Sequence, residues 1–278
     1  MEEIGIMWIA LAVAVVLLVL WLALITPARS KNAQRAPFQN RTFAHRGLYE
    51  KDQSVPENSL KAFQNAVDAG YGVELDVQLT KDKVVVVFHD DDLGRVCGVD
   101  ARVDAYTFEE LQSMPLLGTA ERIPTFTDVL GVLGGKVPVI VELKSGGDWK
   151  TLCPLTLEIL KGYKGDYCVE SFHPLLVRWF YVNAPEVLRG QLSEAYRFSH
   201  RYVPWYQSLM MSRVLTNILA HPQFIAYHIG PKCLSVRISE AMGAMRVAWT
   251  ARVPEDHAAI AKRNDAVIFE HYRPETRF

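Results

Sequence analysis

Short apolar runs that recur between residues 41 and 271 most constrain the fold of this chain. Each run is bounded by Gly, Pro or Asp, and helix-like segments separate them, such as residues 56–70, which end in Gly70. Strands alternating with helices predict a parallel sheet, and about 240 residues are enough for one TIM barrel. We therefore predict an α/β fold, a TIM (β/α)8 barrel over residues 41–278. The eight runs are 41–45, 72–77, 137–143, 167–172, 188–193, 224–229, 246–250 and 266–271.

A further run, KVVVVFHDDD at residues 83–92, follows the second strand too closely for a parallel crossover. It must therefore return as the second strand of an antiparallel hairpin. With a two-residue turn at 81–82, counting outward places His89 opposite Glu74. Asp76 shares the face of Glu74 because side chains two residues apart on a strand point the same way.

Polar side chains stand at the ends of several predicted strands, where the active sites of TIM barrels are built. Three clustered carboxylates repel one another unless a cation joins them, and an all-oxygen donor set suits Mg²⁺ or Ca²⁺. Two basic residues suit a phosphate, and two imidazoles suit acid–base catalysis near neutral pH. The set predicts metal-assisted cleavage of a phosphate ester. It comprises His45, Arg46, Glu74, Asp76, His89, Glu142, Lys144 and, at the end of the seventh strand, Trp249.

Each of these residues alone is a weak indicator. A single strand-end histidine is more often a hydrogen-bonded structural residue, and Glu142 with Lys144 can be a rim ion pair worth about 0–1 kcal/mol. A tryptophan such as Trp249 is usually a core residue or an interface anchor. Their occurrence together at several strand ends favours a functional site, because a purely structural domain has no reason to gather them there.

An uncharged apolar run, IGIMWIALAVAVVLLVLWLALI, covers residues 4–25. As a helix it would extend roughly 33 Å, enough to cross the hydrocarbon core of a bilayer. A cleaved signal peptide is the alternative, but signal peptides begin with basic residues and have a shorter apolar core, whereas Glu2 and Glu3 precede this run. We therefore expect a transmembrane helix anchor at residues 1–28, followed by a polar linker at 29–40.

The charges beside this run predict its orientation. Arg29, Lys31 and Arg35 follow the apolar residues, whereas only the amino terminus offers a positive charge before them. The positive-inside rule then places the C-terminal domain on the cytoplasmic side of the cell membrane.

Composition argues against two other classes of protein. The four cysteines form no CxxC pair, so neither a zinc site nor a disulfide framework is indicated. The formal net charge is −1, and no Lys/Arg run interleaves with aromatic residues, so no nucleic-acid partner is expected. The sequence leaves the oligomeric state open.

Several motifs of this chain occur in an order that resembles the glycerophosphodiester phosphodiesterase family. The resemblance covers essentially the whole domain after the linker and is far more specific than any single short motif. The motifs are AHRG (44–47), PENSLKAFQNAVDAGYGVELDVQLTKD (56–82), VFHDDDLGRVCG (87–98), IPTFTDVL (123–130) and VELK (141–144).

The resemblance implies a role for each matching residue. Glu57 and Asn58 match a loop beside the site, and we expect Glu57 and Trp249 to contribute to substrate binding. An insert at about residues 91–123 is similar to the small cap subdomain of these enzymes. The implied metal ligands are Glu74, Asp76 and Glu142, the implied acid–base pair is His45 and His89, and the implied phosphate-binding residues are Arg46 and Lys144.

Two strand ends depart from the family pattern. The sixth strand reads FIAYHI and the eighth reads AVIFEHYRP, where many relatives have Thr-Asp-x-Pro. We expect this departure to affect recognition of the leaving group and to leave the phosphate chemistry untouched.

The activity implied by the resemblance is metal-dependent hydrolysis of glycerophosphodiesters to sn-glycerol 3-phosphate and an alcohol, with one divalent cation, Mg²⁺ or Ca²⁺. In that scheme one histidine takes a proton from the glycerol 2-hydroxyl, and the other gives a proton to the leaving alkoxide. An alternative activity is a lysophospholipase D-type reaction on membrane lysophospholipids. A non-enzymatic alternative is a membrane-anchored barrel that binds glycerophosphodiesters without cleaving them.

Residues 204–220, PWYQSLMMSRVLTNILA, contain a single charge and are apolar over more than one helical stripe. One interpretation, which we slightly favour from sequence, is a helix buried between the barrel and a neighbouring helix or a second subunit. The other is that Trp205, Tyr206 and the methionines lie in the lipid headgroup region and hold the barrel mouth towards the membrane.

Overall fold

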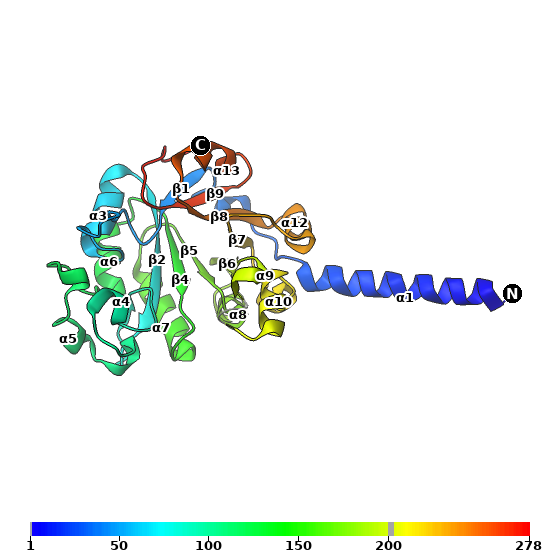
Figure 1. Cartoon of the computed structure of the whole chain (residues 1–278), viewed down its shortest axis with the longest axis horizontal. Coiled ribbons are helices and arrows are strands. Elements are labelled where there is room, and N and C mark those ends of the chain that lie inside the picture. Colours follow the sequence, from blue (N-terminus) through cyan, green and yellow to red (C-terminus); the bar gives the residue numbers. More distant parts are fainter. Residues whose placement is uncertain (1, 200–202) are drawn as a thin grey trace.

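The computed structural model describes residues 2–199 and 203–278. Eight parallel strands form a closed barrel, because β1 pairs with both β2 and β9, and β3 joins β2 as an antiparallel edge (Figure 1). The predicted TIM (β/α)8 barrel is confirmed, and each predicted strand lies within a few residues of its observed position. The strands are β1 (Arg41–Ala44), β2 (Gly72–Leu79), β3 (Val85–Val87), β4 (Val139–Leu143), β5 (Tyr167–Ser171), β6 (Leu188–Ser193), β7 (Phe224–His228), β8 (Met245–Ala251) and β9 (Ala266–Phe269).

Helices surround the barrel, and their ends follow local sequence signals. Ser59 begins α3 by accepting a hydrogen bond from the Ala62 N–H, and Gly70 ends it with a φ of 77°. The helices are α1 (Glu2–Ile25), α2 (Asn32–Arg35), α3 (Leu60–Ala69), α4 (Gly94–Cys97), α5 (Phe108–Leu111), α6 (Phe126–Leu133), α7 (Trp149–Gly162), α8 (Pro174–Asn183), α9 (Tyr196–Ser199), α10 (Trp205–Ser212), α11 (Asn217–Ala220), α12 (Leu234–Ala241) and α13 (His257–Ala261), with 3₁₀ turns η1 (Val103–Ala105), η2 (Leu116–Gly118) and η3 (Pro254–Asp256).

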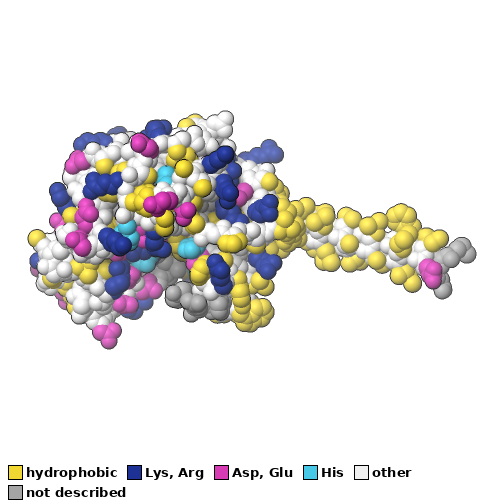
Figure 2. All heavy atoms as spheres, turned by 45° about the horizontal axis from the view of Figure 1, so that its top comes forward, with side chains coloured by type: hydrophobic (Ala, Val, Ile, Leu, Met, Phe, Trp, Pro, Cys, Tyr) yellow, Lys and Arg dark blue, Asp and Glu magenta, His cyan; other side chains and the backbone are white. Residues whose placement is uncertain are grey.

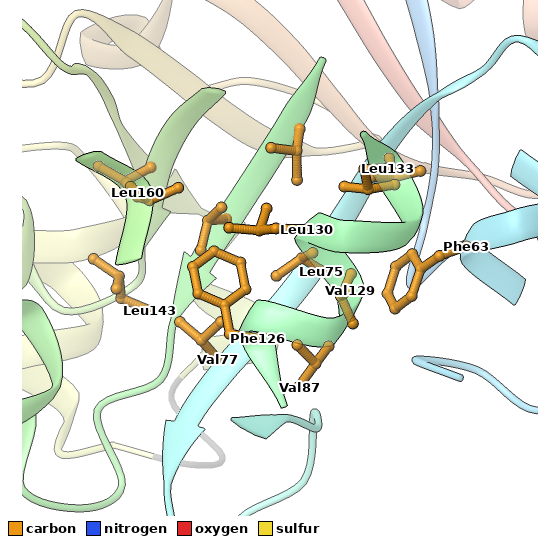
Figure 3. Close-up of a cluster of buried hydrophobic side chains, with 14 of the residues drawn as sticks. Phe63, Leu75, Val77, Val87, Phe126, Val129, Leu130, Leu133, Leu143 and Leu160 are labelled. Carbon is orange, nitrogen blue, oxygen red and sulfur yellow. The ribbon is translucent and has the colours of Figure 1, made fainter. Parts of the chain in front are cut away.

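Alternate residues of each strand face either the barrel interior or the surrounding helices. On β2, Leu75 and Val77 pack outward against α6, where Phe126 and Leu130 meet them (Figure 3). The residues between them, including Glu74, therefore point into the barrel. Apolar side chains such as Phe224 fill the lower interior, and the inward-facing carboxylates Glu74, Asp76 and Glu142 lie above them, towards the carboxyl-terminal end.

The β2–β3 hairpin has a different register from the predicted one. Leu79 pairs with Val85 and the Thr80 N–H donates to the Val84 carbonyl at 3.1 Å, so residues 81–83 form a three-residue loop whose last residue, Lys83, has a φ of 66°. A left-handed residue at the end of a three-residue loop is a common hairpin geometry. The predicted pairing of His89 with Glu74 is therefore wrong by one residue. Strand β3 ends at Val87, so pairing does not set the direction of the His89 side chain.

The insert after the hairpin forms a small unit with its own core. Val96 on α4, Leu111 on α5 and Leu116 on η2 pack with Phe88. The unit is fastened to the barrel rim by Arg95, whose guanidinium lies 2.6 Å from Glu57. Val96, Leu111 and Leu116 belong to the predicted insert at about residues 91–123, whereas Phe88 and Glu57 precede it.

Helix α1 projects away from the barrel and exposes hydrophobic side chains along its length (Figure 2). Its length and composition are sufficient for a membrane span. The segment that follows, predicted as a linker, contains α2 and is attached to the barrel. The Ala28 N–H donates to the Pro222 carbonyl at 2.8 Å, and the Gln34 amide donates to the Glu186 carbonyl at 2.7 Å.

The region 204–220 is divided into α10 and α11. Val214 lies between them with a φ of 49°. On α10, Trp205 is 66% exposed and Met210 is 43% exposed, whereas Ser208 is buried. Of the two forms of burial predicted from sequence, a neighbouring helix does not cover this surface within the described residues, and burial against a second subunit stays a prediction.

Candidate active site

Three carboxylates meet at the carboxyl-terminal end of β2 and β4. Asp76 pairs directly with Glu142 in the parallel register, and Glu74 precedes Asp76 by two residues on the same face. Each of the three offers an oxygen within 4.8 Å of the others, and all three side chains are buried. The sheet register thus brings together the three residues that the motif resemblance implied as metal ligands.

Lys144 lies beside this acidic cluster of Glu74, Asp76 and Glu142. Its Nζ is 2.9 Å from Asp76 Oδ1 and 2.9 Å from Glu142 Oε1. Burial raises the pKa of the Asp76 carboxyl, but Lys144, His89 and Arg46 outweigh burial and hold that pKa well below its usual range. Burial, Asp76 and Glu142 raise the pKa of Glu74 well above its usual range. One nearby ammonium therefore does not compensate all three carboxylates.

The donor chemistry of the acidic cluster fits a hard divalent cation. Buried carboxylates are costly without a compensating charge, and three oxygen donors at this spacing match the preference of Mg²⁺ and Ca²⁺ for oxygen ligands. Glu74, Asp76 and Glu142 are thus a chemically suitable ligand set.

Arg46 follows β1 and lies near Asp76 Oδ2, whereas Lys144 contacts Asp76 Oδ1. Its backbone N–H donates to Glu74 at 3.1 Å, its guanidinium Nε is 3.6 Å from Asp76, and a second guanidinium nitrogen donates to Glu57 at 2.7 Å. The tight turn requires Gly47, where an added Cβ would come 2.9 Å from Ala62. Glu57 therefore holds Arg46 in place, and the described contacts of its carboxylate are to arginines.

His45 lies at the end of β1, next to the acidic cluster. Its Nε2 is 3.9 Å from Glu74, and its Nδ1 is 2.6 Å from Glu270 at the end of β9. Burial and Arg46 lower the pKa of His45, which favours a neutral imidazole. In that form Nδ1–H donates to the Glu270 carboxylate, and the Nε2 lone pair faces the cluster.

His89 reaches the same region despite the error in the predicted register. It is one of the groups that outweigh burial in lowering the pKa of Asp76. Its Nδ1 lies 2.6 Å from the carboxylate of the next residue, Asp90, which Arg95 also contacts. Each of the two histidines is therefore held through Nδ1 by a carboxylate, which leaves both Nε2 atoms available.

Trp249 lies on β8, across the barrel from the acidic cluster. Its indole N–H donates to the Ala226 carbonyl at 3.0 Å, and its ring makes edge contacts with Phe172 and His228 at centroid distances of 5.6 and 5.1 Å. His228 in turn lies 5.0 Å from the ring of Phe198 on α9. We call these four side chains the aromatic row.

Two carboxylates of the mouth were missed by the sequence analysis. Glu170 on β5 pairs with Glu142, is 1% exposed and has one carboxylate oxygen without a hydrogen bond. Glu270, at the end of the eighth barrel strand, contacts His45 Nδ1 at 2.6 Å, and the expectation that the departure at this strand leaves the phosphate chemistry untouched stays a prediction. Both residues were detectable as acidic residues at predicted strand ends, but their partners lie on distant strands.

Comparisons with known proteins agree with this architecture. The model of the glycerophosphoryl diester phosphodiesterase family matches residues 45–272. A glycerophosphodiester phosphodiesterase from Caldanaerobacter subterraneus subsp. tengcongensis is 30% identical over 248 residues, which cover 84% of this chain and 94% of that protein. A lysophospholipase D from Rattus norvegicus is 30% identical over 160 residues, which cover 53% of this chain and 49% of that protein.

The barrel is also similar to solved structures. An Oleispira antarctica phosphodiesterase, solved in complex with the product sn-glycerol-3-phosphate, aligns with a TM-score of 0.68 and 23% identity, covering 84% of this chain and 94% of that one. At this identity the likeness concerns the fold. The extent of the family match, together with the 30% identity to a relative along nearly its whole length, shows that this chain belongs to the glycerophosphoryl diester phosphodiesterase family.

Proposed function

We propose that this chain hydrolyses glycerophosphodiesters to sn-glycerol 3-phosphate and an alcohol, in a reaction that depends on one divalent cation. The observation that carries this proposal is the acidic cluster, with Lys144 bonded to two of its members and two histidines beside it. Charged groups of both signs at one buried site suit a phosphodiester, which needs cationic contacts and proton transfer.

The metal ligands in this proposal are Glu74, Asp76 and Glu142. A bound Mg²⁺ or Ca²⁺ supplies Lewis-acid polarisation of phosphoryl oxygens. The lysine ammonium at 2.9 Å from two of these carboxylates is positioned to hold a phosphate oxygen as well, because an ammonium has three donors. Arg46, kept in place by Glu57, offers a second cationic contact near Asp76 Oδ2.

His45 and His89 are the proposed acid–base pair. One takes the proton of the attacking hydroxyl, and the other gives a proton to the leaving alkoxide. Both are suited to this because Glu270 and Asp90 hold their Nδ1 atoms and so orient the rings. Trp249 is proposed to contact the non-reacting part of the substrate, since its ring belongs to the opposite, apolar wall of the mouth.

Helix α1 is proposed to remain on the mature protein as a membrane anchor. A cleaved signal peptide would not form part of the domain core, yet Ile25 is fully buried and packs with Tyr227 and Val236. Basic residues after the span, including Arg29 and Lys31, place the barrel on the cytoplasmic side in this proposal.

The test is an assay of the full chain in detergent with glycerophosphocholine and glycerophosphoethanolamine, with Mg²⁺, Ca²⁺ or EDTA. We expect metal-dependent release of sn-glycerol 3-phosphate and the free alcohol. Calorimetric binding of these diesters without product would favour the binding barrel and contradict the enzymatic proposal.

A further inference from the structure

The outer surface of α10 carries an unusual pattern for a helix beside a barrel. Such a helix normally buries its apolar stripe against the sheet. On α10 the pattern is reversed, because Ser208 and Ser212 are buried while Trp205, Tyr206 and Met210 are exposed. Grouped exposed apolar side chains of this size indicate an interaction surface.

The last turn of α1 is fixed next to this surface. Ile25 is 0% exposed and packs with Val214, which lies between α10 and α11. The Asn217 side-chain amide donates to the Ile25 carbonyl at 2.9 Å, and the Gln223 side-chain amide donates to the Arg29 carbonyl at 3.2 Å. Helix α1 therefore leaves the barrel in a defined direction, from the side that carries α9, α10 and α12 (Figure 1).

The length of the apolar run brings a bilayer up to the barrel. Residues 4–20 are exposed, and as a helix they extend about 26 Å, less than the roughly 30 Å of a hydrocarbon core. Tilting α1 would shorten its reach across the membrane further. The span is completed only by the next turn, where Trp21, Leu22 and Ile25 pack on the barrel. A bilayer that α1 crosses therefore leaves no gap below the barrel, and side chains level with this turn lie at the membrane surface.

Exposed apolar side chains occur on all three helices beside this turn. Helices α11 and α12 both contact α1. Ile218 of α11 is 47% exposed, and Leu234 of α12 is 64% exposed. We call the exposed apolar residues of α10, α11 and α12 the membrane face: Trp205, Tyr206, Met210, Ile218, Leu219 and Leu234.

The chemistry of this side suits the headgroup region of a membrane. Tryptophan and tyrosine favour the membrane–water interface. Arg29 and Lys31 follow α1, Arg213 follows α10, and all three are exposed. Lys and Arg side chains gather next to the base of α1 (Figure 2). Anionic headgroups attract such cations, whereas a symmetric contact with a second copy would bring like charges together.

We propose that the membrane face lies in the headgroup region of the bilayer, so that α10 is an interfacial helix and the barrel rests directly on the membrane. This inference rests on the proposed anchor role of α1 and is independent of which diester the site cleaves. The Ser193 hydroxyl at the end of β6 donates to the Met211 carbonyl of α10 at 3.0 Å. Contact between α10 and the membrane therefore also fixes the orientation of the barrel mouth relative to the membrane surface.

The test is quenching of tryptophan fluorescence by brominated phospholipids. The full chain is reconstituted in nanodiscs of phosphatidylethanolamine and phosphatidylglycerol, as parent, as Trp205→Phe and as the control Trp149→Phe. Subtracting the emission of each variant from that of the parent gives the emission of the substituted tryptophan. Trp149 is also partly exposed, but it begins α7, on a different side of the barrel from α1 (Figure 1).

We expect lipids brominated in the upper part of the acyl chain to lower the Trp205 emission about twofold or more, because an interfacial helix lies about 5–10 Å into the boundary between headgroups and acyl chains. The Trp149 emission should not change. The Trp205→Phe variant should keep the parent kcat/KM on soluble glycerophosphoethanolamine, because Trp205 lies outside the acidic cluster and the aromatic row.

A third variant, Trp8→Phe, reports on α1 itself, where Trp8 is 60% exposed within the apolar run. Quenching of Trp8 without quenching of Trp205 overturns the inference and leaves the anchor intact. If Trp205→Ser then also converts a dimer to a monomer in detergent, the face is a contact between two copies. Quenching of Trp149 as strong as that of Trp205 also overturns the inference. Absence of quenching at both Trp8 and Trp205 contradicts the anchor, and hydrolysis measured in the same nanodiscs tests the enzymatic proposal separately.

Discussion

The two halves of the barrel mouth differ in chemistry although they are built from the same repeating unit. On β1, β2 and β4 the strand ends carry Glu74, Asp76 and Glu142 with Lys144. On and beside β5, β7 and β8 they carry the aromatic row, whose Trp249 lies across the barrel from the cluster. The first half contains the proposed proton-transfer and charged groups, and the second presents mainly aromatic rings that can exclude water and contact apolar surface.

This difference separates catalysis from substrate choice. Substitutions in the charged half should change kcat for every substrate, because its groups act on the phosphate that all substrates share. Substitutions in the aromatic half should change KM and the preference among substrates, because contacts made equally in the ground and transition states do not accelerate the chemical step.

The largest expected effect is loss of a metal ligand. Glu74→Gln should reduce kcat/KM about 10³-fold or more for all substrates, because Lewis-acid stabilisation is worth several kcal/mol. EDTA should abolish the parent activity reversibly. The matched control is Glu170→Gln, which changes a buried carboxylate one strand beyond Glu142 and should have a much smaller effect. Full activity of Glu74→Gln in chelator would contradict the metal site.

The second largest effect is expected from substitution of the two histidines. His45→Ala and His89→Ala should each reduce kcat by about 10²–10⁴-fold, the usual contribution of a positioned acid or base. The double variant should lose less than the product of the single losses, because both act in one reaction. Near-parent kcat in either variant, with an unchanged circular dichroism spectrum, would be inconsistent with the two-histidine scheme.

Glu270 should act through His45. Glu270→Gln keeps the shape of the side chain but removes the carboxylate that accepts from Nδ1, so we expect a decrease in kcat of about 10- to 100-fold with little change in KM. Steady-state kinetics on soluble diesters measure kcat and KM of the parent and the variant. A change in KM alone would show that Glu270 contributes to binding instead of orienting the imidazole.

The same substitution should change the pH dependence of stability. Burial raises the pKa of Glu270, but His45 and Arg252 outweigh it and hold the pKa well below its usual value. A carboxyl with a depressed folded-state pKa stabilises the fold above its unfolded pKa of about 4.3, and this stability is lost as pH falls towards the folded pKa. Denaturation of parent and Glu270→Gln should therefore differ by about 1–2 kcal/mol at pH 7 and converge below about pH 3. A constant difference across this range would contradict the depressed pKa.

The smallest effect is expected in the aromatic half. Trp249→Leu should raise KM about tenfold and leave kcat within about threefold of the parent, because one large apolar contact is worth about 1–3 kcal/mol. The loss should be greater for a lysolipid than for a soluble diester. A decrease in kcat as large as that of His45→Ala would remove the distinction between the two halves.

The sequence by itself determined the alternation of strands and helices and the identity of the acidic cluster. Strand periodicity is local, so it places Glu74 and Asp76 on one face without knowledge of the partner strands. Because parallel strands of a barrel end on the same side, a polar residue such as Glu142 at a predicted strand end could be assigned to the mouth before any pairing was known.

Tertiary structure decided the contacts that depend on register, closure and burial. The hairpin register depended on the left-handed Lys83, and one added loop residue shifted the pairing. The contact between His45 and Glu270 joins residues 225 apart and forms only when β9 closes the barrel against β1. The exposure of Trp205 could not be predicted either, because an apolar residue has the same local pattern whether it packs in a core or meets a membrane, and only the surrounding fold distinguishes the two.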